Sequence, residues 1–172
     1  MSRQLFLLRH AKSSWDDPDL ADHERPLAPR GDRACGLLAD HLRATGLAPD
    51  LVLCSSAVRA VQTLEGVRAG LPAEAAVEVD GGVYGAGPSI LLRRLRGLDE
   101  EVGSAMVVGH NPAIEELALG LAGEGGDREA RARMEAKYPT GGLASFAFDG
   151  AWWDLDWGRA TLEAFVVPKQ LG

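Results

Sequence analysis

The sequence has few cysteines, no long hydrophobic run and no excess of basic residues. Its two cysteines, Cys35 and Cys54, are too few for a disulfide-built secreted scaffold and predict reduced, buried thiols. No apolar run approaches the roughly 20 residues of a membrane span, and Arg9 interrupts the first run before it could form the core of a signal peptide. Acidic residues outnumber basic ones by 25 to 18, for a net charge of -7, which disfavours nucleic acid as a partner. We therefore expect a cytoplasmic protein that binds neither nucleic acid nor membrane.

The composition is that of an ordinary globular domain. Hydrophobic residues make up 46% and charged residues 25% of the 172 positions, which disfavours disorder. We expect a single domain, residues 1–172, with a sizeable core.

Three short apolar runs are each followed directly by polar residues, at 5–8, 51–54 and 105–108. Such a run predicts a strand covered by helices on both faces, as in a parallel sheet. Hydrophobic periodicity and turn residues predict helices at 29–45, 57–69, 88–98 and 112–122, and further strands at 77–79, 143–148 and 161–167. The pattern therefore favours an α/β fold.

Flanking residues predict where some of these elements begin and what lies between them. Ser56 and Asn111 are expected to be helix N-caps. Residues 14–25 are expected to form a loop over the mouth of a crevice, and residues 124–137 an exposed insertion with a weak helix. The tryptophans near the C-terminus are expected to cap the edge of the sheet; they are Trp152, Trp153 and Trp157.

The polar residues after the three apolar runs predict a phosphate site. Ligands of open α/β sheets bind beyond the carboxyl ends of the strands, so neighbouring parallel strands would bring together Arg9, His10, Arg59 and His110. Arginine offers planar paired donors that suit phosphate, and the first turn of a helix, where Arg59 is expected, favours an anion. We predict that a neutral ring nitrogen of His10 attacks phosphorus, with the arginines neutralising charge and no metal or cofactor required.

Two other chemistries are weaker candidates. Cys54 and Arg59 resemble a cysteine phosphatase loop, but they are separated by four residues where that loop has five, and its glycines are missing. A metal site built from His10, His23 and His110 is disfavoured because the neighbouring arginines would repel a cation.

Several motifs, in order along nearly the whole chain, resemble the histidine phosphatase superfamily and, within it, the small SixA-type phosphohistidine phosphatases. They are Leu8-Arg9-His10-Ala11-Lys12-Ser13, Asp22-His23-Glu24-Arg25-Pro26-Leu27 with Arg30-Gly31, Ser55-Ser56-Ala57-Val58-Arg59-Ala60-Val61-Gln62-Thr63, Val107-Val108-Gly109-His110-Asn111-Pro112, and Pro139-Thr140-Gly141. The resemblance implies a three-layer α/β/α sandwich with a mostly parallel central sheet. It also implies that His10 accepts the phosphoryl group and that Arg9, Arg59 and His110 form the phosphate pocket.

The chain departs from the family pattern at two positions. Ala11 replaces the glycine of the Arg-His-Gly signature, a sterically mild change. The carboxylate general acid of ester-cleaving members would fall near Gly81, which has no side chain; Asp80 is adjacent and is the first candidate for that acid. Further carboxylates lie in the expected mouth loop, at Asp16, Asp17, Asp22 and Glu24.

The missing acid favours one class of substrate. An alkoxide leaves poorly without protonation, whereas an imidazole, whose conjugate acid has a pKa of about 6.5, needs less help. We therefore expect a phosphatase for phosphohistidine on a protein. The alternatives are a phosphomonoesterase for a small phosphorylated metabolite and a non-catalytic phosphate-binding module. Further substrate contacts are predicted for Lys12, Ser13, Asp16 and His23.

Overall fold

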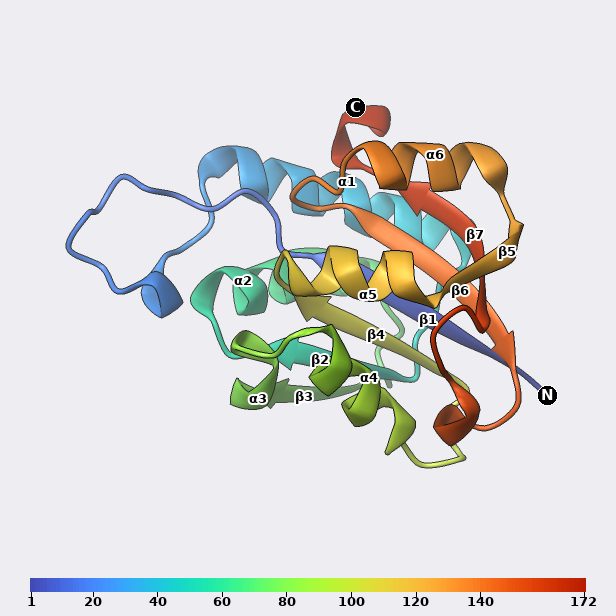
Figure 1. Ribbon diagram of the computed structural model, residues 1–172. Coiled ribbons are helices and arrows are strands. Elements are labelled where there is room, and N and C mark those ends of the chain that lie inside the picture. The colour runs from blue at the N-terminus through green and yellow to red at the C-terminus, as the bar shows by residue number, and fades with distance from the viewer.

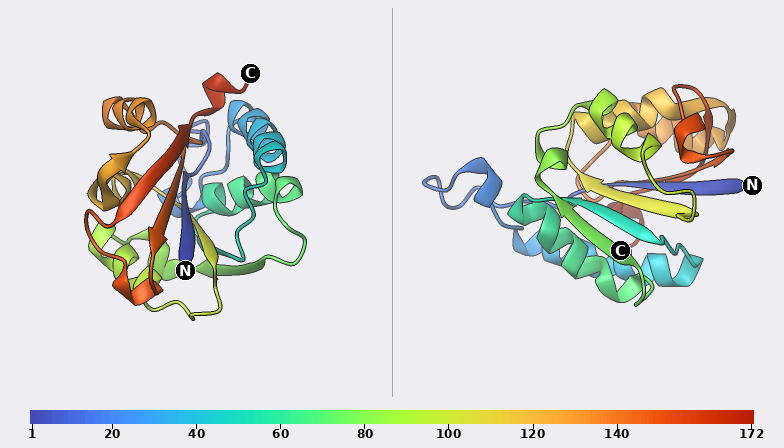
Figure 2. Two further views of the ribbon diagram at one scale, coloured as in Figure 1. Left: turned by 90° about the vertical axis from the view of Figure 1, so that its right-hand side faces the viewer. Right: turned by 90° about the horizontal axis from the view of Figure 1, so that it is seen from below.

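The computed structural model describes residues 1–172 and contains a seven-stranded sheet between two layers of helices (Figure 1; Figure 2). The strands are β1 (Ser2–Arg9), β2 (Leu51–Ser55), β3 (Ala76–Asp80), β4 (Ser104–Gly109), β5 (Ala122–Gly126), β6 (Leu143–Asp149) and β7 (Ala160–Val166). The helices are α1 (Pro29–Thr45), α2 (Val58–Val67), α3 (Gly81–Tyr84), α4 (Pro88–Arg96), α5 (Ala113–Leu121) and α6 (Arg128–Ala136). Short 3-10 helices are η1 (Asp22–Glu24), η2 (Arg68–Gly70), η3 (Trp152–Asp154) and η4 (Pro168–Gln170). The expected three-layer α/β fold is confirmed.

The strand order is β3-β2-β4-β1-β6-β7-β5, and only β6 runs antiparallel to its neighbours. The three apolar runs are thus the adjacent strands β2, β4 and β1. Ala105 pairs with both Leu5 and Leu51, so the three strands are in phase and end at the same level. This register places the residues that follow β1, β2 and β4 at one edge of the sheet.

Both faces of the sheet are buried, which explains the unbroken apolar runs. Leu5 and Leu7 face the core under α4, α5 and α6, while Phe6 and Leu8 face the core under α1 and α2. Phe6 is completely buried, so truncation to alanine there is expected to cost about 3–5 kcal/mol. The site therefore lies at the end of strands whose two faces are both buried.

The two expected N-caps are wrong. Helix α2 begins at Val58 and not after Ser56, and its preceding residue, Ala57, donates its N–H to Ser55 Oγ at 3.2 Å. Helix α5 begins at Ala113, one residue later than expected, with Pro112 at the cap position; Asn111 nevertheless accepts the Glu115 N–H on its Oδ1 at 3.2 Å. In contrast, α1 begins with its expected proline and ends before Gly46, whose φ of 69° is favourable for glycine.

The segment at 124–137 is more integrated than expected. It contains the end of β5, which pairs with β7, and α6, whose Ala130 and Met134 are buried in the larger core. Asp127 caps α6 by accepting a hydrogen bond from the Ala130 N–H at 2.8 Å. Only two apolar residues of α6 reach the core, so its helical periodicity was too weak to predict the packing.

Of the three tryptophans expected to cap the sheet edge, one is buried and two are exposed. Trp152 is buried against Phe148, and its indole N–H donates to the Val102 carbonyl at 2.6 Å. Trp153 and Trp157 are exposed.

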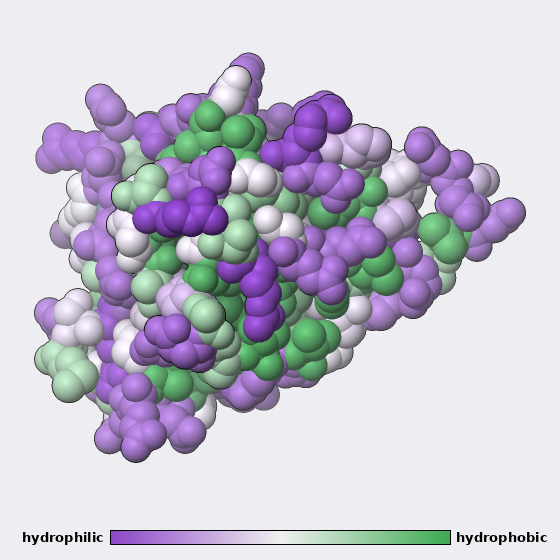
Figure 3. Space-filling model, turned by 180° about the vertical axis from the view of Figure 1, so that it is seen from behind, coloured by the Kyte–Doolittle hydropathy of each residue, from purple (hydrophilic) through white to green (hydrophobic).

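The segment 14–25 projects from the carboxyl edge of the sheet, at the left of Figure 1. Seen from behind, the projecting part of the molecule is largely hydrophilic (Figure 3). No helix has the length and apolar character that crossing a membrane requires.

Candidate active site

The ends of β1 and β4 and the first turn of α2 bring the two predicted histidines and two predicted arginines together. The ring centroids of His10 and His110 lie 5.2 Å apart, and Arg59 is buried although it is charged. Ala11 N–H donates to Thr63 Oγ1 at 2.9 Å, and the Thr63 hydroxyl donates to the Arg59 carbonyl at 2.7 Å. These bonds tie the segment that carries His10 to the helix that carries Arg59.

His10 is held with one ring nitrogen free to react. Its Nδ1 lies 2.7 Å from the Ala11 carbonyl, an acceptor, so Nδ1 carries the proton and Nε2 keeps its lone pair. Burial lowers the pKa of His10 to about 3, with smaller contributions from His110 and the two arginines. The imidazole is therefore neutral at physiological pH, the form that a nucleophile requires.

His110 is also neutral, and its hydrogen bonds define its role. Its Nε2 lies 2.7 Å from Ser55 Oγ, which already accepts the Ala57 N–H and can direct its own proton to Nε2. The proton of His110 is then on Nδ1, which is buried and has no partner. Burial, followed by the charge of Arg59, lowers the pKa of His110 to about 4.

Arg9 presents a second buried donor without a partner. Its Nη1 donates to the Tyr138 carbonyl at 2.9 Å, an oxygen that Asn111 Nδ2 also contacts at 3.0 Å. Its Nε has no partner, and this atom and His110 Nδ1 are the only buried side-chain nitrogens or oxygens without a hydrogen bond. Buried donors are normally satisfied, so two unsatisfied donors in one cluster indicate a site for an anionic ligand.

Arg59 is paired with a carboxylate from the projecting segment. Its Nη1 and Nη2 donate to the backbone oxygen and Oδ2 of Asp22 at 2.7 and 3.0 Å. Oδ2 also accepts the Tyr84 hydroxyl at 2.6 Å, and Oδ1 accepts Arg25 Nη1 at 2.9 Å. The Tyr84 hydroxyl, with Arg59 and Arg25, holds the pKa of Asp22 well below its usual range, so this carboxylate stays ionised.

The aromatic ring of Tyr84 lies beside His110 at the entrance to the cluster. The Tyr84 ring packs edge-on against His110 and His23, with centroid distances of 5.5 and 4.8 Å. His23 Nε2 lies 2.8 Å from Ser56 Oγ, so Ser56 contacts the projecting segment and does not cap α2. A Cβ at Gly81 would meet only Ser56 Oγ, at 3.7 Å, so the position of the missing acid has room for a side chain.

The remaining predicted residues are distributed around the cluster. Ser13 is buried and its hydroxyl accepts Arg25 Nη2 at 2.5 Å. Asp16 is exposed on the projecting segment, and Lys12 is exposed in a neighbouring groove. The Asp80 carboxylate accepts the Gly82 N–H at 2.8 Å and lies 3.5 Å from Arg94 Nε, so it caps α3. Neither aspartate is bonded to the four central residues.

The other two chemistries find no support in the geometry. Burial raises the pKa of the Cys54 thiol to about 12, and its Sγ contacts the Ser55 carbonyl at 3.3 Å, so it is no thiolate nucleophile. No three His, Cys, Asp or Glu side chains are arranged to hold a metal ion.

Sequence and structure comparisons identify the family of the chain. Residues 5–82 match the histidine phosphatase superfamily (branch 1). The chain is 42% identical to the uncharacterized protein Rv1276c of Mycobacterium tuberculosis over 94% of its own length and 100% of that protein. It is similar to the structure of a proposed phosphohistidine phosphatase SixA from Agrobacterium tumefaciens, with 30% identity, a TM-score of 0.81, and 96% and 98% of the two chains covered. A structure of the protein histidine phosphatase SixA with tungstate has 26% identity, a TM-score of 0.79, and coverage of 98% and 99%.

The chain belongs to the histidine phosphatase superfamily. Its similarity to the SixA structures extends over nearly all of both chains, so within that superfamily it is of the SixA type.

Proposed function

We propose that the protein removes the phosphoryl group from phosphorylated histidine on a protein or peptide, through a phosphohistidine formed on His10. One observation carries the proposal: the buried donors without partners, Arg9 Nε and His110 Nδ1, belong to the same cluster as the free Nε2 of His10. A phosphoryl group in this cluster would supply the acceptors that these donors lack. The similarity to a SixA structure that contains tungstate, a tetrahedral oxyanion, supports an anion site of this kind.

The reaction proceeds in two displacements. The lone pair on His10 Nε2 forms a bond to phosphorus while the P–N bond of the substrate breaks, and the departing imidazole nitrogen takes a proton from water. Water then attacks phosphorus on His10 and gives up a proton to the hydroxide left by the first step, that P–N bond breaks, and phosphate leaves with His10 restored. Charge on the phosphoryl oxygens is stabilised by Arg9, Arg59 and His110 in both steps.

The choice of substrate depends on which residues could protonate the leaving group. Asp22 contacts Arg59 but is held ionised, so it does not protonate a leaving group. Gly81 offers no side chain, and Asp80 is engaged as a helix cap. Without a carboxylic acid, departure of imidazole is favoured over departure of an alkoxide. A phosphomonoesterase for a small metabolite remains the alternative, with another carboxylate of the mouth as its acid.

The test compares three substrates: a peptide carrying phosphohistidine, an aryl phosphate with a good leaving group, and an alkyl phosphate with a poor one. We expect the kcat/KM of the alkyl ester to be at least about 100-fold below that of the phosphohistidine peptide, because a general acid usually contributes a rate factor of at least this size. Equal or better turnover of the alkyl ester would establish the alternative. Phosphate binding without turnover of any substrate would indicate a non-catalytic module.

A further inference from the structure

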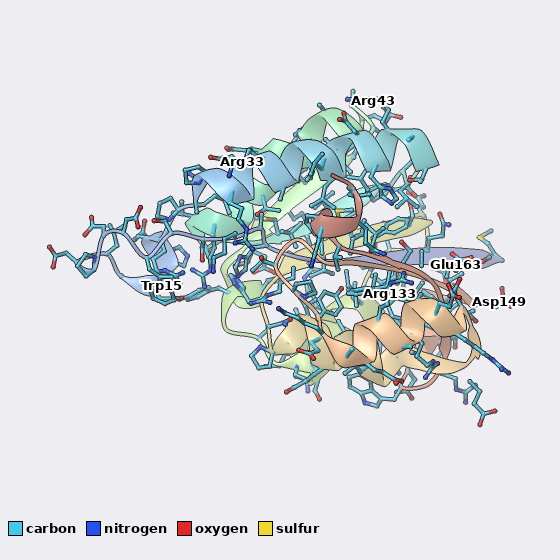
Figure 4. All side chains as sticks on the ribbon, turned by 90° about the horizontal axis from the view of Figure 1, so that it is seen from above. Trp15, Arg33, Arg43, Arg133, Asp149 and Glu163 are labelled. Atoms are coloured by element: carbon cyan, nitrogen blue, oxygen red, sulfur yellow. The ribbon has the colours of Figure 1, made fainter.

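A groove between α1, α6 and the C-terminal segment is separate from the catalytic cluster and has a volume of about 720 Å³. Figure 4 looks down on the two helices, with Arg133 on the α6 side. The groove has five cationic lining residues and no Asp or Glu side chain, although the last residue, Gly172, also lines it; the cations are Lys12, Arg30, Arg133, Lys137 and Lys169. This concentration is unusual for a chain whose net charge is -7.

The five cations are not used by the fold as ion pairs. None of the salt bridges of the molecule, to a side chain or to a chain terminus, includes any of them. All five side chains are exposed, and only Arg133 has a side-chain hydrogen bond, to the Phe165 carbonyl at 2.6 Å. Exposed cations gathered without carboxylate side chains among them repel one another, so an anionic ligand would relieve that repulsion.

The lining between the cations is partly apolar. Leu37, Val167 and Pro168 are half-buried there, and each leaves apolar surface open to the groove. Free phosphate or a nucleic-acid backbone would leave this surface unused, whereas a peptide with acidic and apolar side chains would cover both kinds of surface.

The groove is a separate cavity, but two of its lining residues are close in sequence to residues of the catalytic cluster. Lys12 is two residues beyond His10, and Lys137 precedes Tyr138, whose carbonyl accepts from Arg9. The turn that follows Tyr138 is also bonded to the catalytic cluster, because the Gly141 N–H contacts the backbone oxygens of both Arg9 and His10 at 3.0 Å. A chain whose phosphorylated residue reaches His10 can therefore lay a neighbouring segment in the groove.

From these observations we propose that the groove between α1 and α6 binds an acidic, partly apolar peptide segment of the phosphorylated partner protein. The proposal rests on the proposed function for the identity of the partner, but the binding itself requires no phosphohistidine. Docking beside the catalytic cluster would let the enzyme select its partner by charge while His10 performs the same chemistry on every substrate.

The test measures fluorescence anisotropy of a labelled peptide of repeating Glu-Glu-Leu, without phosphate, bound to the intact protein. The double variant Arg30→Glu with Lys169→Glu should bind at least about tenfold more weakly than the wild type. The matched control, Arg93→Glu with Arg96→Glu on α4, makes the same change in net charge at exposed positions outside the groove and should bind like the wild type. If the reversed pair fails to fold, the neutral pair Arg30→Gln with Lys169→Gln should still weaken binding by about threefold.

Parallel arms use an oligothymidylate and vesicles containing anionic lipid. Absence of saturable peptide binding, or equal loss in the control pair, would overturn the proposal. Tighter binding of the oligonucleotide or the vesicles, lost in the groove variant, would assign the groove to nucleic acid or to a membrane surface instead. If the protein binds the peptide but dephosphorylates no phosphohistidine, the proposed function is refuted and the peptide-binding proposal stands.

Discussion

Lowering the pH from 7 to 5 should destabilise the folded protein, because His10 and His110 are buried in their neutral forms. Burial lowers their pKa values to about 3 and about 4, whereas an unfolded histidine titrates near 6.5. Below pH 6.5 the unfolded state therefore binds more protons than the folded state. The free energy of unfolding is highest above pH 6.5 and falls as the pH drops toward the folded pKa values.

The size of the effect follows from the same values. At pH 5 the unfolded histidine is almost fully protonated while both folded histidines remain neutral. Each pH unit below 6.5 then removes about 1.4 kcal/mol per histidine, which gives about 2 kcal/mol for each at pH 5. Asp22 does not contribute to the loss of stability between pH 7 and pH 5, because folding shifts its pKa downward from a value that is already below pH 5.

Urea denaturation at pH 7 and pH 5 measures the loss. The variants His10→Gln and His110→Gln should each lose about 2 kcal/mol less than the wild type between the two pH values, and the double variant about 4 kcal/mol less. Each variant is compared with itself at the two pH values, so any difference in its stability at pH 7 cancels. An identical pH dependence in wild type and variants would refute the burial of neutral imidazoles, as would an NMR titration of His10 near pH 6.5.

Two further predictions concern catalysis. On a small aryl phosphate, Arg59→Ala should lower kcat/KM by at least about 100-fold, because it removes charge-assisted hydrogen bonds to phosphate worth about 1.5–3 kcal/mol each. Lys12→Ala should lower kcat/KM for the same substrate by less than about tenfold. Steady-state kinetics check this, and equal losses would mean that the arginine is not part of the phosphate pocket. Gly81→Glu should raise turnover of an alkyl phosphate relative to the wild type by supplying an acid beside Ser56. Gly85→Glu, where a Cβ meets nothing within 4 Å, is the matched control. A gain in both variants, or in neither, would contradict the assignment of the missing acid.

The central strands and the four residues at their ends could be predicted from the sequence because each signal is local. An apolar run covered on both faces is continuous in sequence, and the residues that leave it, such as His10 and His110, are adjacent to it. Because the paired strands end at the same level of the sheet, these residues then lie close together. Their catalytic roles stay a prediction until they are tested.

The partners of these residues could not be predicted, because they come from distant segments with no pattern of their own. Asp22 pairs with Arg59 across 37 positions, and Tyr84 reaches Asp22 from α3 across 62 positions. The sequence offered Asp22 only as one of several carboxylates in a polar loop. Helix α6 was underestimated for a related reason, since its burial depends on β7, which follows it in the chain.

The most direct measurement is rapid quenching of the wild-type protein with a phosphohistidine peptide whose phosphorus is radioactive, followed by mapping of the label. We expect an acid-labile, base-stable label on His10, with its amplitude approaching the enzyme concentration, and no label in His10→Ala. Turnover of the peptide with the label on another residue, or with the His10→Ala variant as active as the wild type, would contradict this expectation.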